Sequence, residues 1–421
     1  MAAPSHNALG IYVSIPFCRS KCTYCNFASG VYPASDHARY IDRLIQDLAA
    51  APAWHNQMGL ELPRAVDTIF LGGGTPSLLA PELLERLFAA IRSQFRVEPD
   101  AEITIECAPG QISDETLAAF GTVGVNRVSM GVQSFIDREA KVSGRLHTRA
   151  IVEKDLVRLR RAGIANLNLD LIAGLAGQTH ASWDESLSVL IDSGVPHASV
   201  YMLEVDEDSR LGREMLLGGA RYYAEMVPTD DIIAEMYTHA IERLAEAGIA
   251  QYEISNFSRP GFASRHNLRY WQRRPYLGVG LDASSMAVAA ADSREDRYTL
   301  RSTTTSDLAA YLIGPEPAET TWLSPARQHE EAWFLGLRLN SGVSVTQLKK
   351  EFGPEPVAQA MEVVASLKED GLLQSNGKTV RLTAQGQLLS NEVFQQFLGL
   401  DADSEAEEDR LPSETGVPTP A

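Results

Sequence analysis

Three of the four cysteines of this 421-residue chain lie close together, as Cys18, Cys22 and Cys25. Their CxxxCxxC spacing follows an apolar run that we expect to be a strand, so the cysteines should occupy the loop at its C-terminal end. A structural zinc ion needs four ligands, and only His37 and the distant Cys107 offer a fourth. Three thiolates on one short loop fit an iron–sulfur cluster better, with one iron left open to a ligand from outside the protein.

A glycine-rich segment, LGGGTPS, follows the second expected strand and spans residues 71–77. Its glycines allow the backbone to approach a small ligand closely, and Pro76 helps to fix the turn into the next helix. On its own, a glycine triplet after a strand is more often a plain turn. Gly73, Gly74 and Thr75 become candidate binding residues because of the cysteine loop that precedes them.

The elements that must position these motifs are short apolar runs alternating with longer helical patterns. In the helix expected at 81–95, leucines, Phe88 and Ile91 recur on one face. Six such strand–helix repeats imply parallel strands joined by right-handed crossovers. We therefore expect an α/β fold with a partial (βα)6 barrel and its chemistry at the C-terminal strand ends. The expected strands are 10–15, 66–71, 102–106, 125–131, 166–172 and 198–203, with further helices at 37–50 and 230–246.

Polar side chains end several of these strands. Glu106 ends the third strand, Gln133 ends the fourth with Arg145 expected in the following helix, and Asp170 lies in the fifth. Each residue taken alone is best explained as a solvated strand end. Together they would line the mouth of the barrel, where a ligand would be held.

The cysteine and glycine motifs together resemble the radical SAM superfamily, and the resemblance covers nearly the whole chain. With Tyr12 and the segment IPFC, it extends to the branch of oxygen-independent coproporphyrinogen oxidases and HemW-like heme chaperones. The resemblance implies a 4Fe–4S cluster on Cys18, Cys22 and Cys25, and S-adenosylmethionine at the open iron. It also implies that S-adenosylmethionine contacts Tyr12, Tyr24, Gly73, Gly74, Thr75, Glu106, Gln133, Arg145 and Asp170. Cys107 is expected to be a small buried apolar residue.

Phe27 marks a departure from the oxidases of this branch, which carry a fourth cysteine two residues after the third. Phenylalanine cannot ligate iron or donate a hydrogen atom, although it can shield a cluster from water. This difference disfavours coproporphyrinogen decarboxylation.

A second distinguishing motif, HNxxYW, comprises His266, Asn267, Tyr270 and Trp271, in a region that we expect to be a glycine- and arginine-rich loop. In the HemW-like proteins this motif is associated with heme binding. A neutral imidazole is a good axial ligand for heme iron, and the two aromatic rings offer flat apolar surface. Four neighbouring arginines are expected to pair with heme propionates: Arg265, Arg269, Arg273 and Arg274. A single histidine in a loop with core aromatics would favour a purely structural role.

From Ser324 the pattern changes to three helices (327–339, 344–353 and 355–373), a hairpin with Asn376–Gly377 at its tip, and a last helix at 384–398. We expect a small winged-helix-like domain. The expected organisation is a radical SAM core (1–245), a connecting region with the heme motif (246–323), this C-terminal domain (324–400) and a disordered acidic tail (401–421).

Composition restricts the function classes. The net charge of −18 argues against general nucleic-acid binding, and residues 324–400 are not basic enough for a DNA-binding winged helix. No window is long and apolar enough to span a membrane, and the N-terminus lacks the pattern of a secretory signal. Four cysteines do not form a disulfide framework, so we expect a cytoplasmic protein.

The leading hypothesis is a heme chaperone that binds heme, a 4Fe–4S cluster and S-adenosylmethionine, and passes heme to an acceptor protein. If that acceptor is a membrane protein, the chaperone would contact the membrane only peripherally. The alternative is a radical SAM oxidoreductase acting on a porphyrinogen. There, one electron from the cluster would cleave S-adenosylmethionine to a 5′-deoxyadenosyl radical that abstracts hydrogen. Formation of 5′-deoxyadenosine with consumption of coproporphyrinogen III would distinguish the two.

Overall fold

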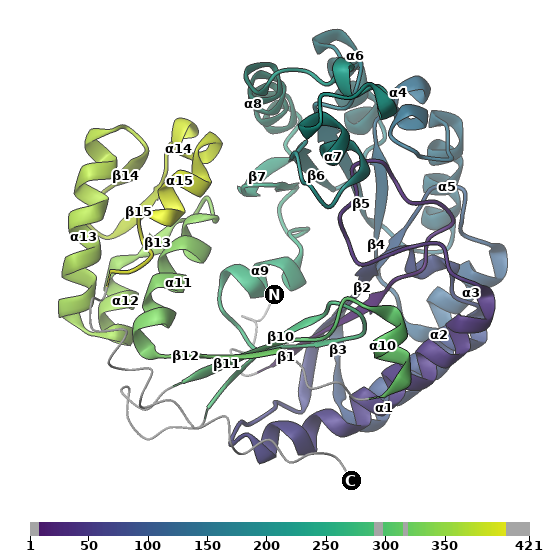
Figure 1. The fold of residues 1–421 in the computed structure, drawn as a ribbon, viewed down its shortest axis with the longest axis horizontal. Coiled ribbons are helices and arrows are strands. Elements are labelled where there is room, and N and C mark those ends of the chain that lie inside the picture. Colours follow the sequence, from purple (N-terminus) through teal and green to yellow (C-terminus); the bar gives the residue numbers. More distant parts are fainter. Residues whose placement is uncertain (1–7, 290–297, 315–318, 401–421) are drawn as a thin grey trace.

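A single 12-stranded sheet dominates the computed structural model, which describes residues 8–289, 298–314 and 319–400 (Figure 1). The expected disordered tail, 401–421, lies outside the described residues. The strand order is β12-β11-β10-β9-β1-β2-β3-β4-β5-β6-β8-β7. Helices α1, α2, α3 and α5 cover the outer face of the curved sheet (Figure 1). The helices of this part are α1 (Ala34–Gln57), α2 (Pro81–Gln94), α3 (Asp114–Val123), α4 (Asp137–Val142), α5 (Arg149–Arg161), α6 (His180–Asp192), α7 (Arg210–Leu216), α8 (Asp230–Glu246), α9 (Arg265–Trp271) and α10 (Leu308–Ile313), with 3-10 turns η1 (Pro76–Leu78) and η2 (Arg221–Met226).

The six central strands are parallel and follow one another in chain order, which confirms the expected partial barrel. They are β1 (Leu9–Ile15), β2 (Ala65–Gly73), β3 (Arg96–Cys107), β4 (Arg127–Gln133), β5 (Asn166–Ala173) and β6 (His197–Met202). Their apolar side chains are almost fully buried because helices cover one face and the barrel interior the other. Within the described ranges the sheet stays open, with β12 at one edge and β7 at the other.

Between residue 250 and Ser324 the chain forms strands and short helices, so the expectation of a glycine- and arginine-rich loop region after residue 258 was wrong. This region adds strands to both edges of the parallel sheet: β7 (Ala250–Glu253), β8 (Asn256–Ser258), β9 (Tyr276–Val279), β10 (Ser284–Val288), β11 (Thr299–Thr303) and β12 (Glu319–Leu323). These strands have three to five residues and contain Gly, Ser and Thr, so their pattern is too short to stand out from a loop. They obtain their order from the sheet, since β9 pairs with β1 and β8 with β6.

The C-terminal unit has its own apolar core, in which the Trp333 and Phe397 rings stack 5.1 Å apart. Helices α11 (Pro325–Leu337), α12 (Val345–Phe352) and α13 (Pro354–Glu369) pack with a three-stranded sheet of β13 (Val343–Ser344), β15 (Thr379–Leu382) and β14 (Leu373–Ser375). The expected last helix is divided at Leu389 into α14 (Ala384–Leu388) and α15 (Ser390–Gln395). These elements agree with the predicted winged-helix-like arrangement.

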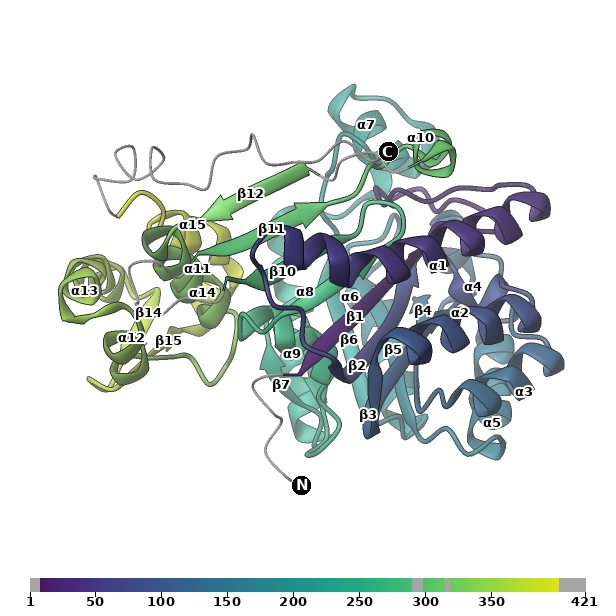
Figure 2. The same ribbon diagram turned by 90° about the horizontal axis from the view of Figure 1, so that it is seen from below.

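The C-terminal unit lies beside β10, β11 and β12 of the large sheet (Figure 2), and it also contacts the turn after β7 at the other edge. Glu253 forms an antiparallel bridge with Leu339, and the Ile254 N–H donates to the Arg338 carbonyl. The Ile254 side chain packs in the C-terminal core. No helix in the described ranges is both long and apolar enough to cross a membrane.

Candidate functional site

The cysteine loop leaves the C-terminal end of β1 and is tied down at both ends. Its start and finish are joined by hydrogen bonds from the Cys18 N–H to the Gly30 carbonyl (2.8 Å) and from the Gly30 N–H to the Pro16 carbonyl (2.9 Å). In its middle, the Thr23 N–H donates to the carbonyl of Ser143, beyond β4. Cys18 and Cys25 are partly exposed and Cys22 is buried, and all three thiols are free. The loop therefore presents three unbridged thiols from a fixed backbone.

The glycine motif holds the start of this loop. The Gly74 N–H donates to the Ile15 carbonyl and the Thr75 N–H to the Phe17 carbonyl, both at 2.8 Å. A Cβ atom on Gly74 would lie 2.8 Å from the Phe17 carbonyl oxygen, so no larger residue fits without moving the backbone. Gly73 has a φ of +97° and lies against Ser14. The glycines thus fix β2 to the segment that carries the first cysteine.

Most of the predicted site residues line one cavity of about 620 Å³. A volume of this size is typical of small-molecule sites. The predicted lining residues are Cys18, Cys22, Cys25, Tyr24, Gly73, Gly74, Thr75, Glu106, Gln133, Arg145 and Asp170, together with the exposed Phe27. Tyr12 is not among them, because its ring lies near Phe70 and His266. Arg145 follows α4 in the segment before α5, so its predicted position in a helix was wrong.

The cavity combines buried acidic side chains with a buried arginine. Burial and the neighbouring Asp170 raise the pKa of Glu106 to about 8, and burial also raises the pKa of Asp170. The Gln133 Oε1 and Arg145 Nε atoms are buried without a hydrogen-bond partner among the described residues. Gln133 has a φ of +71°, beside a bulge in the β4–β5 pairing that re-aims its side chain. The cavity therefore offers a polar ligand both hydrogen-bond acceptors and a hydrogen-bond donor.

The three cysteines share the cavity without forming a closed metal site. Across the described ranges, no group of three or more His, Cys, Asp or Glu side chains is arranged to hold a metal ion. Thr75 Oγ1 lies 3.9 Å from Cys18 Sγ, and Ser29 Oγ lies 4.0 Å from Cys25 Sγ. Three thiols on one loop, once deprotonated, are a donor set that suits a 4Fe–4S cluster with one iron left open.

Sequence reasoning missed several residues of the cavity wall. His147 lies two positions after Arg145, and its Nε2 is buried without a partner in the described part of the chain. Burial and the adjacent Arg145 lower the pKa of His147 to about 4, so its imidazole is neutral. The wall on the other side includes Tyr201, Tyr237, Ile254, Arg338, Leu388 and Asn391. Arg338 and the last two come from the C-terminal unit, which no local sequence pattern links to the cysteine loop.

The HNxxYW motif lies on the short helix α9 and not on the expected loop. The Nδ1 of His266 lies 2.9 Å from Thr68 Oγ1, and its Nε2 lies 2.9 Å from the Tyr270 hydroxyl. The side chain is 1% exposed, and burial and the nearby Arg269 lower its pKa far below the ordinary value. The imidazole is therefore neutral, with both nitrogens engaged inside the protein. His266, Asn267, Tyr270 and Trp271 are not among the cavity-lining residues.

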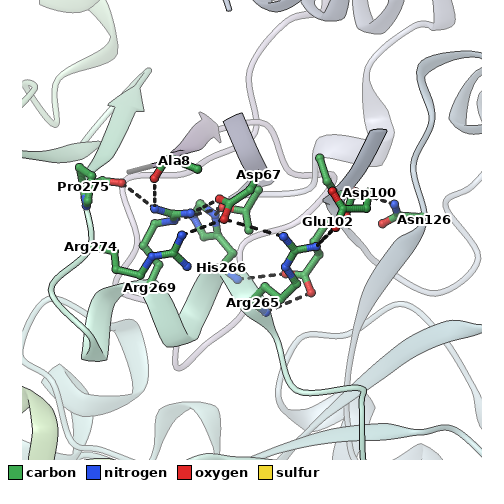
Figure 3. A network of polar contacts seen from close by, with 12 residues as sticks. Ala8, Asp67, Asp100, Glu102, Asn126, Arg265, His266, Arg269, Arg274 and Pro275 are labelled. Carbon is green, nitrogen blue, oxygen red and sulfur yellow. Dashed lines mark hydrogen bonds and ion pairs between the residues drawn. The ribbon is translucent and has the colours of Figure 1, made fainter. Parts of the chain in front are cut away.

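Carboxylates of β2 and β3 hold α9 in place (Figure 3). Glu102 accepts hydrogen bonds from the backbone N–H groups of Arg265 and His266, both at 3.0 Å, at the N-terminus of the helix. Asp67 pairs with the fully buried Arg269 and, at 2.8 Å, with Arg274. The contacts in Figure 3 explain why a seven-residue helix is stable here.

The four arginines around the motif, which we expected to pair with propionates, lie next to carboxylates of the protein itself. Arg265 lies 3.8 Å from Asp67 and 3.9 Å from Asp100, while Arg269 and Arg274 pair with Asp67. Arg273 pairs with Glu351 of the C-terminal unit at 2.7 Å. All four guanidinium groups already have a carboxylate partner.

Replacing Asp67 by asparagine is expected to lower the free energy of unfolding by about 3–5 kcal/mol, because Arg269 would be left buried without a countercharge. Asp100→Asn is the matched control. Its carboxylate is exposed and 3.9 Å from Arg265, so its loss should change stability by less than about 0.5 kcal/mol. Denaturant unfolding of both variants measures the difference. Equal midpoints would show that Asp67 does not anchor α9.

Two family models match the chain: that of the Radical SAM superfamily over residues 12–190, and that of the HemN C-terminal domain over residues 323–389. Among curated proteins, the heme chaperone HemW of Lactococcus lactis is 34% identical over 387 residues, which cover 92% of this chain and 96% of that protein. The HemW of Bacillus subtilis is 34% identical over 391 residues, covering 92% and 98%. The mitochondrial radical S-adenosyl methionine domain-containing protein 1 of Bos taurus is 32% identical, covering 91% and 86%.

A solved structure shares the fold. Coproporphyrinogen III oxidase (HemN) of Escherichia coli, described as a radical SAM enzyme, superposes with a TM-score of 0.77. The match covers 93% of this chain and 90% of that chain, at 22% sequence identity. At this identity the similarity establishes the architecture alone.

Proposed function

Since the chain belongs to the heme chaperone HemW family of the radical SAM superfamily, we propose that it binds heme and delivers it to an acceptor protein. The observation that carries the proposal is the similarity to HemW proteins over nine tenths of the chain. Phe27 supports it, because the position at which the oxidases carry a fourth cysteine holds a side chain that cannot ligate iron. We place this activity in the cytoplasm, with no nucleic-acid partner.

The cavity supports a resident 4Fe–4S cluster on Cys18, Cys22 and Cys25 and a bound S-adenosylmethionine. When bound, the cluster supplies an open iron site and an electron. Four buried polar residues of the cavity wall would hold S-adenosylmethionine. Gln133 and Arg145 each have a buried polar atom without a hydrogen-bond partner among the described residues. Burial raises the pKa of Glu106 and of Asp170. Tyr24 and the segment 73–75 complete this wall. Tyr12 would contribute only through a rearrangement, because it lies outside the lining.

The alternative, a radical enzyme acting on a porphyrinogen, is favoured by one observation. The candidate cysteines and eight of the nine candidate S-adenosylmethionine residues share the same cavity. Anaerobic incubation of the reduced, reconstituted protein with coproporphyrinogen III distinguishes the two functions. Accumulation of 5′-deoxyadenosine with consumption of the porphyrinogen would favour the enzyme, whereas heme binding without turnover favours the carrier.

His266, Asn267, Tyr270 and Trp271 are the proposed heme contacts, with His266 as axial ligand. In the observed arrangement, ligation by His266 requires the loss of its contact with Thr68 or Tyr270. We expect His266→Ala to weaken heme binding at least tenfold in an absorbance titration of the reconstituted protein. His197→Ala is the matched control, because His197 is also buried with both ring nitrogens engaged, by Asn168 and Tyr252.

Equal losses in the two variants would indicate general destabilisation and would remove the support for His266. A third variant, His147→Ala, tests the imidazole that lines the cavity. Loss of the heme spectrum in that variant alone would place the iron in the cavity and not at α9. If wild type binds no heme, the chaperone proposal itself fails.

A further inference from the structure

Arg338 stands at the junction of the cavity, the HNxxYW helix and the C-terminal unit. It is the first residue after α11 and lines the cavity on the side of the C-terminal unit. Its side chain is 24% exposed. Its backbone carbonyl accepts the hydrogen bond from Ile254 that connects the C-terminal unit to the turn after β7. The backbone of Arg338 is therefore held at this junction.

The guanidinium group of Arg338 is held against an aromatic ring, but its Nε–H has no hydrogen-bond acceptor among the described residues. It lies over the indole of Trp271, with Cζ 4.2 Å from the ring centroid. Its Nη2 is 3.7 Å from Glu253 Oε2, too long for a hydrogen bond. In the described part of the chain, both the Arg338 Nε and the Glu253 Oε2 are buried without a hydrogen-bond partner. Glu253 therefore partly neutralises the positive charge of Arg338, but it accepts no hydrogen bond from the guanidinium N–H groups.

Of the other cations of the cavity wall, Arg19 is exposed, and two more are already used within the wall. Lys21 donates to the backbone carbonyls of Phe27 and Ser29 at 2.9 and 3.0 Å, within the cysteine loop. Arg145 donates to the Gly131 carbonyl at 2.5 Å and lies among the proposed S-adenosylmethionine residues. Arg338 differs from both, because its face is supported by an aromatic ring while its donors lack close acceptors. This is the geometry of a guanidinium prepared for a planar anion.

We propose that Arg338 binds a carboxylate of the cargo, holding one propionate of heme at the end of the cavity next to Trp271. The inference rests on the proposed heme function and adds the residue that recognises the acid group. The indole of Trp271, on which the guanidinium lies, joins this end of the cavity to the heme contacts proposed on α9. Glu253 keeps the guanidinium charge compensated while no carboxylate is bound.

The test compares iron protoporphyrin IX with its dimethyl ester, which has the same ring and iron but no carboxylate. Both are titrated into the reconstituted full chain as wild type, Arg338→Gln, Glu253→Gln and Arg381→Gln. We expect wild type to prefer the acid, and Arg338→Gln to weaken acid binding about tenfold or more while changing ester binding less than twofold. Arg381, an exposed arginine of the same unit, is the matched charge control and should change neither.

Glu253→Gln should strengthen acid binding severalfold, because it removes the carboxylate that competes for Arg338 and keeps the Oε1 acceptor used by Ser255 and Asn256. A purely structural role for Arg338 predicts the opposite, a loss for both ligands. Equal weakening of acid and ester by Arg338→Gln, or no preference for the acid in wild type, would overturn the inference. If wild type binds neither ligand, the proposed heme function itself fails. This outcome differs from the failure of the Arg338 role, in which wild type still binds heme.

Arg338→Gln leaves Glu253 buried without its countercharge, which endangers folding. The double variant Arg338→Gln/Glu253→Gln removes both charges and avoids this problem. It should fold and show the same lost preference for the acid. A double variant that folds and still prefers the acid as strongly as wild type contradicts the proposal.

Discussion

Serine in place of any one of Cys18, Cys22 and Cys25 will abolish the iron–sulfur cluster of the reconstituted protein. A hydroxyl is a far weaker iron ligand than a thiolate, and the loop has no spare cysteine because Phe27 occupies the next suitable position. Cys107 cannot substitute for a lost ligand. It is 5% exposed, and burial raises its pKa far above the ordinary value, so it stays a thiol. Iron and sulfide content, with the visible absorbance of the cluster, measure the effect.

Cys107→Ser is the matched control for these variants. It places a hydroxyl in an apolar position, which should cost about 1–3 kcal/mol of stability, but it should leave a full complement of iron and sulfide. If a single loop variant kept the full cluster, the ligand assignment would be wrong. If Cys107→Ser lost the cluster while remaining folded, Cys107 would have to be counted among the ligands.

Glu106→Gln is expected to lower the affinity for S-adenosylmethionine at least tenfold and to stabilise the ligand-free protein at high pH. The first effect follows from the loss of a buried carboxylate that would pair with the ligand's ammonium group. The second follows from the pKa of Glu106, which burial and Asp170 raise from 4.5 to about 8. The folded state therefore holds this proton more tightly than the unfolded state, and the stability of wild type falls as pH rises between 4.5 and 8.

Glutamine carries no charge at any pH, so the variant escapes this loss. At pH 9 it should be more stable than wild type by on the order of 3 kcal/mol, and the two should converge near pH 5. Calorimetric titration and thermal unfolding across this range provide the two measurements. Glu102→Gln is the control, since this buried carboxylate of the same strand holds α9 and is not among the cavity-lining residues. An unchanged affinity in Glu106→Gln would remove Glu106 from the site.

The parallel half of the sheet could be predicted from sequence because each strand is a short apolar run followed by a long amphipathic helix. All six predicted strands are present, with ends differing by up to six residues. The site residues at their C-terminal ends were predictable for the same reason, since parallel topology brings residues as distant as Cys18 and Asp170 to one edge. The start of β3 differs most, because its first five residues are largely exposed and include charged residues and a proline, a pattern that does not resemble a strand.

The surroundings of α9 could not be predicted, because its partners are distant in the chain and local sequence does not encode which charges will meet. Arg269 and Asp67 are far apart in sequence, yet Asp67 pairs with both Arg269 and Arg274. Arg338 shows the converse, since it looks like an ordinary residue at a helix end. Its importance appears only when β7, α9 and the C-terminal unit are placed together.

Strand β1 is made first but lies in the middle of the finished sheet, between β2 and β9. Gly10 pairs with Tyr276, so the two partners are separated by 276 − 10 = 266 positions. At about 5–20 residues per second, a ribosome that has added Gly10 needs roughly 13–53 s more to reach Tyr276. Throughout that interval the β9-facing edge of β1 has no strand to pair with, and unpaired edges are templates for aggregation. Slower translation therefore lengthens the period in which this edge of the nascent chain, which already carries the cysteine loop, stays exposed to aggregation.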